Sequence, residues 1–221
     1  MRKRRFSKTQ LIPLLLLVVI GAALIVFGAL GIRDYVRTTS EGEPYPSDGV
    51  VATTDVASER PILVTDTEYT VADTQPRRVM IESISVDAYV QKVGVDKSGA
   101  MATPSNINFV GWYVDSPIPG ESGVSILNGH VGGRYTDGVF KHIKDIQPAD
   151  SIKIQMGDLT WREFKVVSNT SYPVEQSASP LFKKSTEFDK ELHLITCSGK
   201  FDDRSQTYDE RTILVARYIE K

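Results

Sequence analysis

The sequence predicts a mostly β domain over residues 77–221, preceded by a polar linker and by one helix long enough to span a membrane. Three observations lead to this division. Residues 11–32 are uncharged and almost wholly apolar, residues 33–76 are rich in Thr, Ser, Asp, Glu and Pro, and short β-like segments separated by turn residues begin at Arg77. The 41% apolar and 24% charged composition is that of an ordinary globular protein and adds little.

The run 11–32 predicts a transmembrane anchor. A helix of this length is about 33 Å long, enough to cross a hydrocarbon layer of about 30 Å. A cleaved signal peptide is the alternative, but its apolar core is usually only about 7 to 15 residues long. Basic residues before the run place residues 1–10 in the cytoplasm and the rest outside the cell; they are Arg2, Lys3, Arg4, Arg5 and Lys8.

The linker and the charge balance exclude some classes of protein. Residues 33–76 lack the apolar surface that would offset chain ordering, so we expect a largely disordered extracellular stalk. The chain has 26 basic and 28 acidic residues. Without the five basic residues at its amino terminus, 21 basic and 28 acidic residues remain, a net charge of −7. This balance argues against nucleic acid as a partner.

The pattern from Arg77 onward indicates a single closed β core with little helix. Ile152, Ile154 and Met156 alternate with polar residues before a turn at Gly157, and residues 160–167 return the chain, which predicts a hairpin. Residues 192–197 and 212–219 are apolar enough to be central strands. A short helix is expected over residues 139–146, and a second within residues 107–113.

Cys197 is the only cysteine in the sequence, and it ends a strand-like run. A single thiol outside the cell cannot close an internal disulfide, so it is a buried small hydrophobe, an intermolecular link or a reactive group. A reactive thiol needs an imidazole or another cation nearby, because the thiolate is the attacking species.

Only three histidines can serve such a thiol. His193 lies about 13 Å from Cys197 along the same strand, too far for contact. His142 is on the polar side of a helical pattern, where histidine is usually solvated. His130 ends a β-like run before Gly132, at a strand edge of the kind that displays functional groups, although spacing alone cannot bring it to the thiol.

A cation that stabilises an oxyanion is also expected, and both Arg204 and Arg211 follow the thiol. Arg204 lies in the polar stretch 202–207, which predicts a loop. Arg211 opens the last strand, a more rigid support.

These residues resemble the sortases, the cysteine transpeptidases of bacterial cell surfaces. Residues 126–130 (ILNGH) are similar to the family's apolar strand ending in Gly-His, residues 194–197 (LITC) to its Leu-x-Thr-Cys signature, and residues 211–216 (RTILVA) to its Arg-led strand. Residues 111–121 and 198–202 look most like sortases of classes E and F, with class F favoured. His193 stands where the signature usually has Thr, which suggests a packing or surface position.

The resemblance implies a sortase-type closed β-barrel of about eight strands with one or two short helices, and His130, Cys197 and Arg211 as its catalytic set. It implies that Ile195 and the loop 169–190 shape the substrate groove, with Thr196 near the cleaved bond. The implied substrates are surface proteins with a C-terminal sorting signal of the LPXTG type, and the acceptor is an amine of a peptidoglycan precursor or a pilin lysine. No metal and no cofactor are expected, since two isolated ligands are too few for a metal site.

Two other functions fit parts of the sequence. One is a different exported cysteine enzyme that acts on peptidoglycan, such as an L,D-transpeptidase or a papain-like endopeptidase. Papain-like enzymes place Cys before His, however, whereas His130 precedes Cys197 here. The other is a non-enzymatic surface domain in which Cys197 is merely buried.

Overall fold

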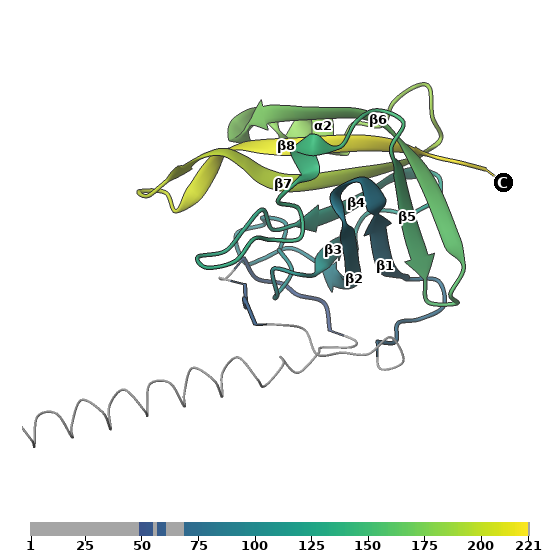
Figure 1. The fold of residues 1–221 in the computed structure, drawn as a ribbon, viewed down its shortest axis with the longest axis horizontal. Coiled ribbons are helices and arrows are strands. Elements are labelled where there is room, and N and C mark those ends of the chain that lie inside the picture. Colours follow the sequence, from purple (N-terminus) through teal and green to yellow (C-terminus); the bar gives the residue numbers. More distant parts are fainter. Residues whose placement is uncertain (1–48, 55–56, 61–68, 221) are drawn as a thin grey trace, which may run out of the picture. The chain divides into compact units, whose positions relative to one another are not determined.

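The computed structural model describes residues 49–54, 57–60 and 69–220, and their strands close into one barrel (Figure 1). Neighbouring strands around the barrel are β1, β2, β3, β4, β7, β8, β6 and β5, and β5 pairs with β1. The predicted closed barrel of eight strands is therefore confirmed. The strands are β1 (Pro76–Ile81), β2 (Val86–Val93), β3 (Val110–Tyr113), β4 (Gly123–Gly129), β5 (Ser151–Met156), β6 (Trp161–Pro173), β7 (Lys190–Asp202) and β8 (Thr207–Tyr218).

Alternating side chains explain how the barrel buries its core. In β5 the residues Ile152, Ile154 and Met156 are all buried, while the polar residues between them are half-buried. This period of two puts one face of the strand inside the barrel. The predicted hairpin is confirmed, because β5 and β6 pair antiparallel across a turn at Gly157. Apolar residues of all eight strands meet in the interior.

Two strand pairs are parallel, and one of them determines where the thiol lies. β2 pairs parallel with β3, and β4 pairs parallel with β7. Parallel neighbours need a long connection, and residues 130–189 between β4 and β7 provide it. β4 is buried on both faces along most of its length, as expected for a central strand of this kind.

Helix is scarce in the described residues, as predicted, but its positions differ. Residues 107–113, expected to hold a helix, instead lead into strand β3, where Val110 and Trp112 enter the core and pairing with β2 and β4 outweighs local pattern. The predicted helix at 139–146 is reduced to turns and the short 3₁₀ helix η2 (Ile143–Asp145). Two further 3₁₀ helices are η1 (Glu82–Ile84) and η3 (Val174–Gln176), and the α-helix is α2 (Ala178–Phe182).

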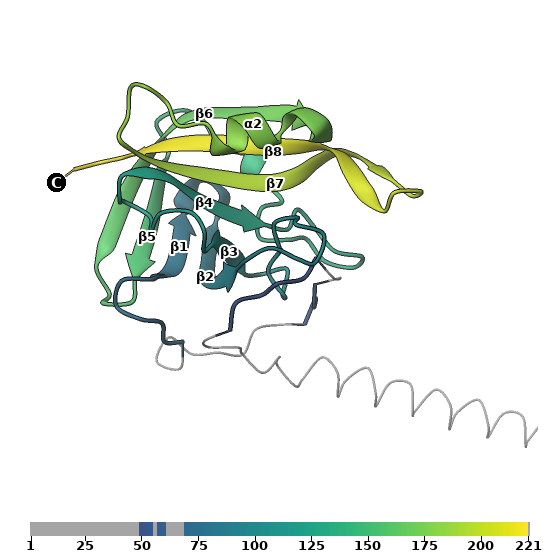
Figure 2. The same ribbon diagram turned by 180° about the vertical axis from the view of Figure 1, so that it is seen from behind.

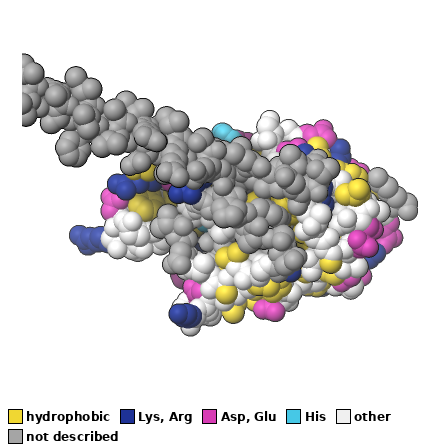
Figure 3. Space-filling model, turned by 90° about the horizontal axis from the view of Figure 1, so that it is seen from below, with side chains coloured by type: hydrophobic (Ala, Val, Ile, Leu, Met, Phe, Trp, Pro, Cys, Tyr) yellow, Lys and Arg dark blue, Asp and Glu magenta, His cyan; other side chains and the backbone are white. Residues whose placement is uncertain are grey.

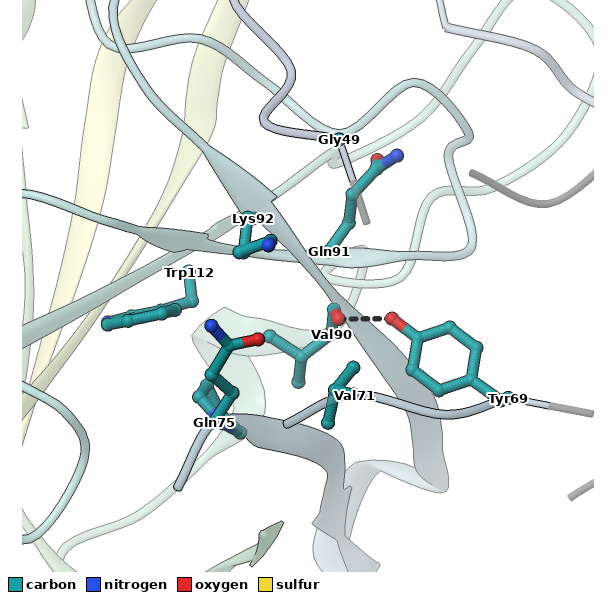
Figure 4. Close-up of a pocket in the computed structure, with 9 residues that line it drawn as sticks. Gly49, Tyr69, Val71, Gln75, Val90, Gln91, Lys92 and Trp112 are labelled. Carbon is teal, nitrogen blue, oxygen red and sulfur yellow. Dashed lines mark hydrogen bonds between the residues drawn. The ribbon is translucent and has the colours of Figure 1, made fainter. Parts of the chain in front are cut away.

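Described residues before β1 contact the barrel, which differs from the disordered stalk expected over 33–76. Tyr69 is only 2% exposed; its ring stacks on Tyr89, and its hydroxyl donates a hydrogen bond to the Val90 carbonyl (Figure 4). Val51 and Ser58 form isolated bridges with Val93 and Asn106. The sparse apolar residues of this range thus reach a partner that composition alone does not reveal.

The pocket drawn in Figure 4 lies between this segment and β2 and has a volume of about 10 Å³. Such a volume holds about one water molecule, so it is no substrate site. The predicted cytoplasmic segment 1–10 and anchor 11–32 lie outside the described residues. Within the part that is described, no helix is long and apolar enough to cross a membrane.

The β7–β8 hairpin extends beyond the barrel as a two-stranded ribbon, visible from both sides (Figures 1 and 2). The ribbon begins just after Cys197 and carries the exposed Phe201, whose ring packs edge-on against Tyr208. Where the described residues are visible in Figure 3, both basic and acidic side chains occur.

Candidate active site

The structure brings the three predicted catalytic residues to one level of the barrel, on three neighbouring strands. In the β7–β8 pair, Cys197 is directly opposite Arg211. The last pair in the parallel β4–β7 register is Asn128 with Ile195. If this register is continued by two residues, His130 lies beside Cys197. Side chains on one face recur every second residue, so all three lie on the outer face, with the thiol in the middle.

His130 is held by a backbone carbonyl rather than by an acidic side chain. Its Nε2 lies 2.9 Å from the Pro104 carbonyl oxygen, which can only accept a hydrogen bond. Nε2 therefore carries the hydrogen, and Nδ1 of the neutral ring keeps a free lone pair. Burial lowers the pKa of His130, and the hydrogen bond to Pro104 opposes this only in part. The resting imidazole is thus neutral at pH 7 and able to accept a proton.

Cys197 is half-buried, and burial raises the pKa of its thiol above the ordinary value of 9.0, while the Arg211 guanidinium acts in the opposite direction. The resting site therefore holds a neutral thiol beside a neutral imidazole. The thiolate forms when a proton is transferred to His130, so attack and proton transfer are coupled.

This resting state predicts how the thiol reacts with a neutral methanethiosulfonate reagent. Because only the thiolate reacts, the logarithm of the labelling rate should rise by about one per pH unit from pH 7 to 9 without a plateau. The Arg211→Ala variant should need higher pH for the same rate, because the guanidinium lowers the pKa of Cys197. Stopped-flow labelling measures the rate at each pH, and the urea-unfolded protein serves as the reference for an unperturbed thiol. A plateau below pH 7 would show a preformed thiolate and contradict the account.

Arg211 is oriented by its own strand. One guanidinium nitrogen, Nη1, donates to the carbonyls of Tyr208 and Glu210, at 2.9 and 2.8 Å, and Nη2 donates to Thr207 Oγ1 at 3.2 Å. Regular pairing of β7 with β8 is interrupted just after the thiol, between Ser198 and Phe201. Irregularities of this kind re-aim side chains next to active sites, and the contacts here fix the guanidinium at the base of the ribbon.

Glycine is required in this irregularity. Gly199 has φ +83°, and a Cβ there would lie 2.2 Å from Asp209 Oδ1. The same Asp209 oxygen accepts a hydrogen bond of 2.6 Å from the Lys200 amide. The turn of the chain directly after Cys197 is therefore built by a positive-φ residue and one carboxylate.

Thr196 does not lie where a substrate-binding side chain would. It is 3% exposed and on the opposite face of β7 from Cys197, and its hydroxyl donates a 2.7 Å hydrogen bond to the Gly129 carbonyl. Gly129 directly precedes His130. The contact of Thr196 with substrate stays a prediction, and in this structure the strand alternation turns its side chain inward. It ties the strand of the thiol to the strand of the imidazole.

Ile195 shares the face of the thiol and belongs to an apolar group that we call the outer-face cluster. The cluster covers the outside of β4, β7 and β8 next to the site; its buried members are Val124, Ile126, Leu181 and Ile213, with the partly buried Met101, Tyr113, Tyr172, Ile195 and Val215 around them. An apolar surface beside the thiol agrees with the role predicted for Ile195. The predicted loop 169–190 is shorter than expected, because β6 continues to Pro173.

The other candidates lie elsewhere. His193 is buried and bonded within β7 and to α2, and His142 is exposed and paired with Asp145 at 3.1 Å. Arg204 is exposed near the tip of the ribbon. No group of three or more His, Cys, Asp or Glu suited to a metal gathers anywhere in residues 49–54, 57–60 and 69–220.

One site contact was missed because it comes from before the predicted domain. The Glu59 carboxylate accepts hydrogen bonds from the amides of Arg134, Tyr135 and Thr136 at 2.6 to 2.9 Å, in the loop after His130. A Cβ on Gly133 would lie 2.5 Å from this carboxylate, so a side chain at position 133 would require the Glu59 carboxylate to shift. Burial acts to raise the pKa of Glu59, but the hydrogen bonds together lower it.

Replacing Glu59 by Gln should loosen this loop. The side-chain amide keeps one acceptor oxygen where three amide donors converge, so amide exchange at 134–136 should speed up by about tenfold. Hydrogen exchange with mass spectrometry measures this. Since the pKa of Glu59 is lowered, acid should reproduce the effect only as pH falls below the ordinary glutamate range. Glu175→Gln, at an exposed position on η3, is the control; equal effects would remove this role of Glu59.

Comparisons with known proteins identify the family. The model of the Sortase domain matches residues 79–219, well over half of the chain. Solved structures with the same fold include sortase A from Corynebacterium diphtheriae, with a TM-score of 0.51 and 17% identity over 66% of this chain and 61% of that one. Another is sortase C2 of pilus island 1 from group B Streptococcus, with a TM-score of 0.50 and 17% identity over 74% and 82% of the two chains.

This chain thus spans less than two thirds of the Corynebacterium structure, and at these identities the structural likeness shows the fold alone. No protein with a curated description matches the sequence. The domain match nevertheless decides against membership in an unrelated family of peptidoglycan enzymes. The chain belongs to the sortase family.

Proposed function

We propose that this sortase cleaves a C-terminal sorting signal of the LPXTG type and transfers the carrier protein to an amine at the cell surface. The observation that carries the proposal is the shared level of His130, Cys197 and Arg211 on three adjacent strands. A nucleophile, a neutral base and a fixed guanidinium in one row match the needs of acyl transfer through a thioester.

The residues divide the reaction between them. Cys197 Sγ attacks the carbonyl of the scissile peptide bond while its proton passes to Nδ1 of His130. The imidazolium then gives this proton to the leaving amine, and a thioester remains. Arg211 donates to the oxyanion from guanidinium hydrogens that Tyr208, Glu210 and Thr207 do not use. The incoming amine attacks the thioester carbonyl and gives a proton to His130. The carbon–sulfur bond then breaks, and the imidazolium returns this proton to the released Cys197 thiolate.

The sequence supports a place for this reaction. The apolar run 11–32 and the basic residues before it fit a single-pass anchor with a cytoplasmic amino terminus and an extracellular catalytic domain. The acceptor amine would come from a peptidoglycan precursor or a pilin lysine. The outer-face cluster offers an apolar surface of the kind that a Leu-Pro pair would contact. The similarity of residues 111–121 and 198–202 to class E and F sortases supports a class F assignment within the family.

Mass spectrometry of acyl products tests the proposal. The full chain in detergent is incubated with sorting-signal peptides that differ at single positions and with amines that include triglycine, diaminopimelic acid and a lysine peptide. We expect one signal to give a thioester adduct on Cys197 and an amine-linked product. Two results would contradict the proposal: cleavage of none of the peptides by the unaltered chain, or undiminished cleavage by the Cys197→Ala variant.

A further inference from the structure

His193 and Glu191 form a fully buried pair that the proposed chemistry does not use. Each side chain is only 1% exposed, and both lie on the outer face of β7, two and three alternations away from Cys197. His193 Nε2 is 3.0 Å from Glu191 Oε2. A buried ionisable pair is costly to form unless its polar atoms find partners, so the other hydrogen bonds of this pair show what it holds in place.

Both members of the pair reach out of the strand to the segment around α2. His193 Nδ1 lies 2.8 Å from the Leu181 carbonyl, and because a carbonyl only accepts, Nδ1 carries a hydrogen. Glu191 Oε1 accepts a 2.9 Å hydrogen bond from the Ser185 amide. The pair therefore holds the chain at the end of α2 and again three residues beyond it.

The segment fastened in this way carries part of the apolar surface beside the thiol. The Leu181 side chain, 4% exposed, is a buried member of the outer-face cluster. The next residue, Phe182, is 53% exposed and packs edge-on against Tyr113 with ring centroids 6.3 Å apart. In Figure 2, α2 lies across the outside of the strands that form the ribbon. A helix of five residues has little stability of its own, so its position depends on such contacts.

We propose that His193 and Glu191 are positioning residues: they fasten the α2 segment over the outer-face cluster and thereby set the affinity for the sorting signal, without a part in the chemistry at Cys197. The substrate in this statement rests on the proposed function. The sequence signature gives no hint of this role, since it usually has threonine where this chain has His193.

Substitutions of the pair test the proposal in two independent ways. In His193→Ala the buried Glu191 loses its partner, so we expect KM for the sorting peptide to rise about tenfold with kcat changed less than about twofold. Without any substrate, amide exchange at 181–185 should become faster. Glu191→Ala should act in the same way. The effect of the double variant should be smaller than the sum of the two single effects, because the two residues share the contact between His193 Nε2 and Glu191 Oε2.

Glu191→Gln serves as the conservative variant. Its oxygen can accept from the Ser185 amide and its amide hydrogen can bond Nε2 of a neutral His193, so KM should stay within about threefold of the unaltered chain. His142→Ala, at an exposed histidine paired with Asp145, is the matched control and should change neither KM nor exchange. If His193→Ala does not fold, the same comparison is made with Ser185→Pro, which removes the amide donor from the loop side.

The outcomes separate the two proposals. A fall in kcat with unchanged KM, or unchanged exchange at 181–185 in a folded variant, would overturn the positioning role. A full chain that forms no acyl product with any peptide would overturn the proposed function, while the exchange measurement would still decide whether the pair fastens α2.

Discussion

Replacement of Cys197 by alanine should abolish thioester formation and lower turnover of a sorting peptide by at least about 1000-fold. The site offers no second nucleophile in the same place: Thr196 faces the other side of β7 with its hydroxyl bonded to the Gly129 carbonyl, and the buried Ser198 also lies on that side. Intact-protein mass spectrometry after acid quenching shows whether the acyl adduct forms.

A stability measurement completes this test. Cys197 is half-buried and in none of the apolar clusters of the described residues, so the alanine variant should keep the melting transition of the unaltered chain. A folded variant that still cleaves the peptide would show that the thiol is not the nucleophile.

Arg211→Ala should lower kcat by about 100-fold or more, because loss of a fixed oxyanion donor costs about two to three orders of magnitude in other acyl-transfer enzymes. Arg204→Ala is its matched control. Arg204 is exposed near the ribbon tip, where a solvated charge interacts only weakly with other groups. Its loss should therefore change kcat by less than about twofold. Steady-state kinetics with one peptide and one amine measures both.

A third variant, Arg211→Lys, tests the orientation of the guanidinium. Arg211→Lys keeps the charge but cannot donate in the planar arrangement that serves Tyr208, Glu210 and Thr207 together, so it should restore only a small part of kcat. Equal losses for Arg204→Ala and Arg211→Ala would mean that general charge near the ribbon, rather than this position on β8, matters.

The sequence was sufficient for most of the strands, and it selected the candidates for the catalytic set. Alternation in β5 and continuous apolar runs in β4, β7 and β8 are local signals, and they predicted both the hairpin and the central strands. In the sequence, position favours His130 over His142 and His193, and Arg211 over Arg204. The resemblance to sortases implies the same two residues together with Cys197. The register that puts them side by side is a long-range property, and it emerged only from the pairing of β4 with β7.

Contacts made through the backbone were beyond prediction. The partner of His130 is the carbonyl of Pro104, and every residue has a carbonyl, so no residue type marks it. The local pattern around β3 favours a helix, but the conformation of its four residues is determined by pairing with the strands on both sides, which the local sequence does not show. Composition places Glu59 and Tyr69 in a stalk. Composition does not show that these residues bond to the loop after His130 and to strand β2.

The parallel β4–β7 pair also links reactivity to the completion of folding. Gly129 and Thr196 are 67 residues apart in sequence, and their hydrogen bond forms only when these two strands meet. Closing so long a loop costs conformational entropy. In a barrel with many contacts between distant residues, we therefore expect this pairing to form late in folding. A chain that has not yet closed its barrel therefore carries a thiol with no base beside it, and the nucleophile becomes competent only in the finished enzyme.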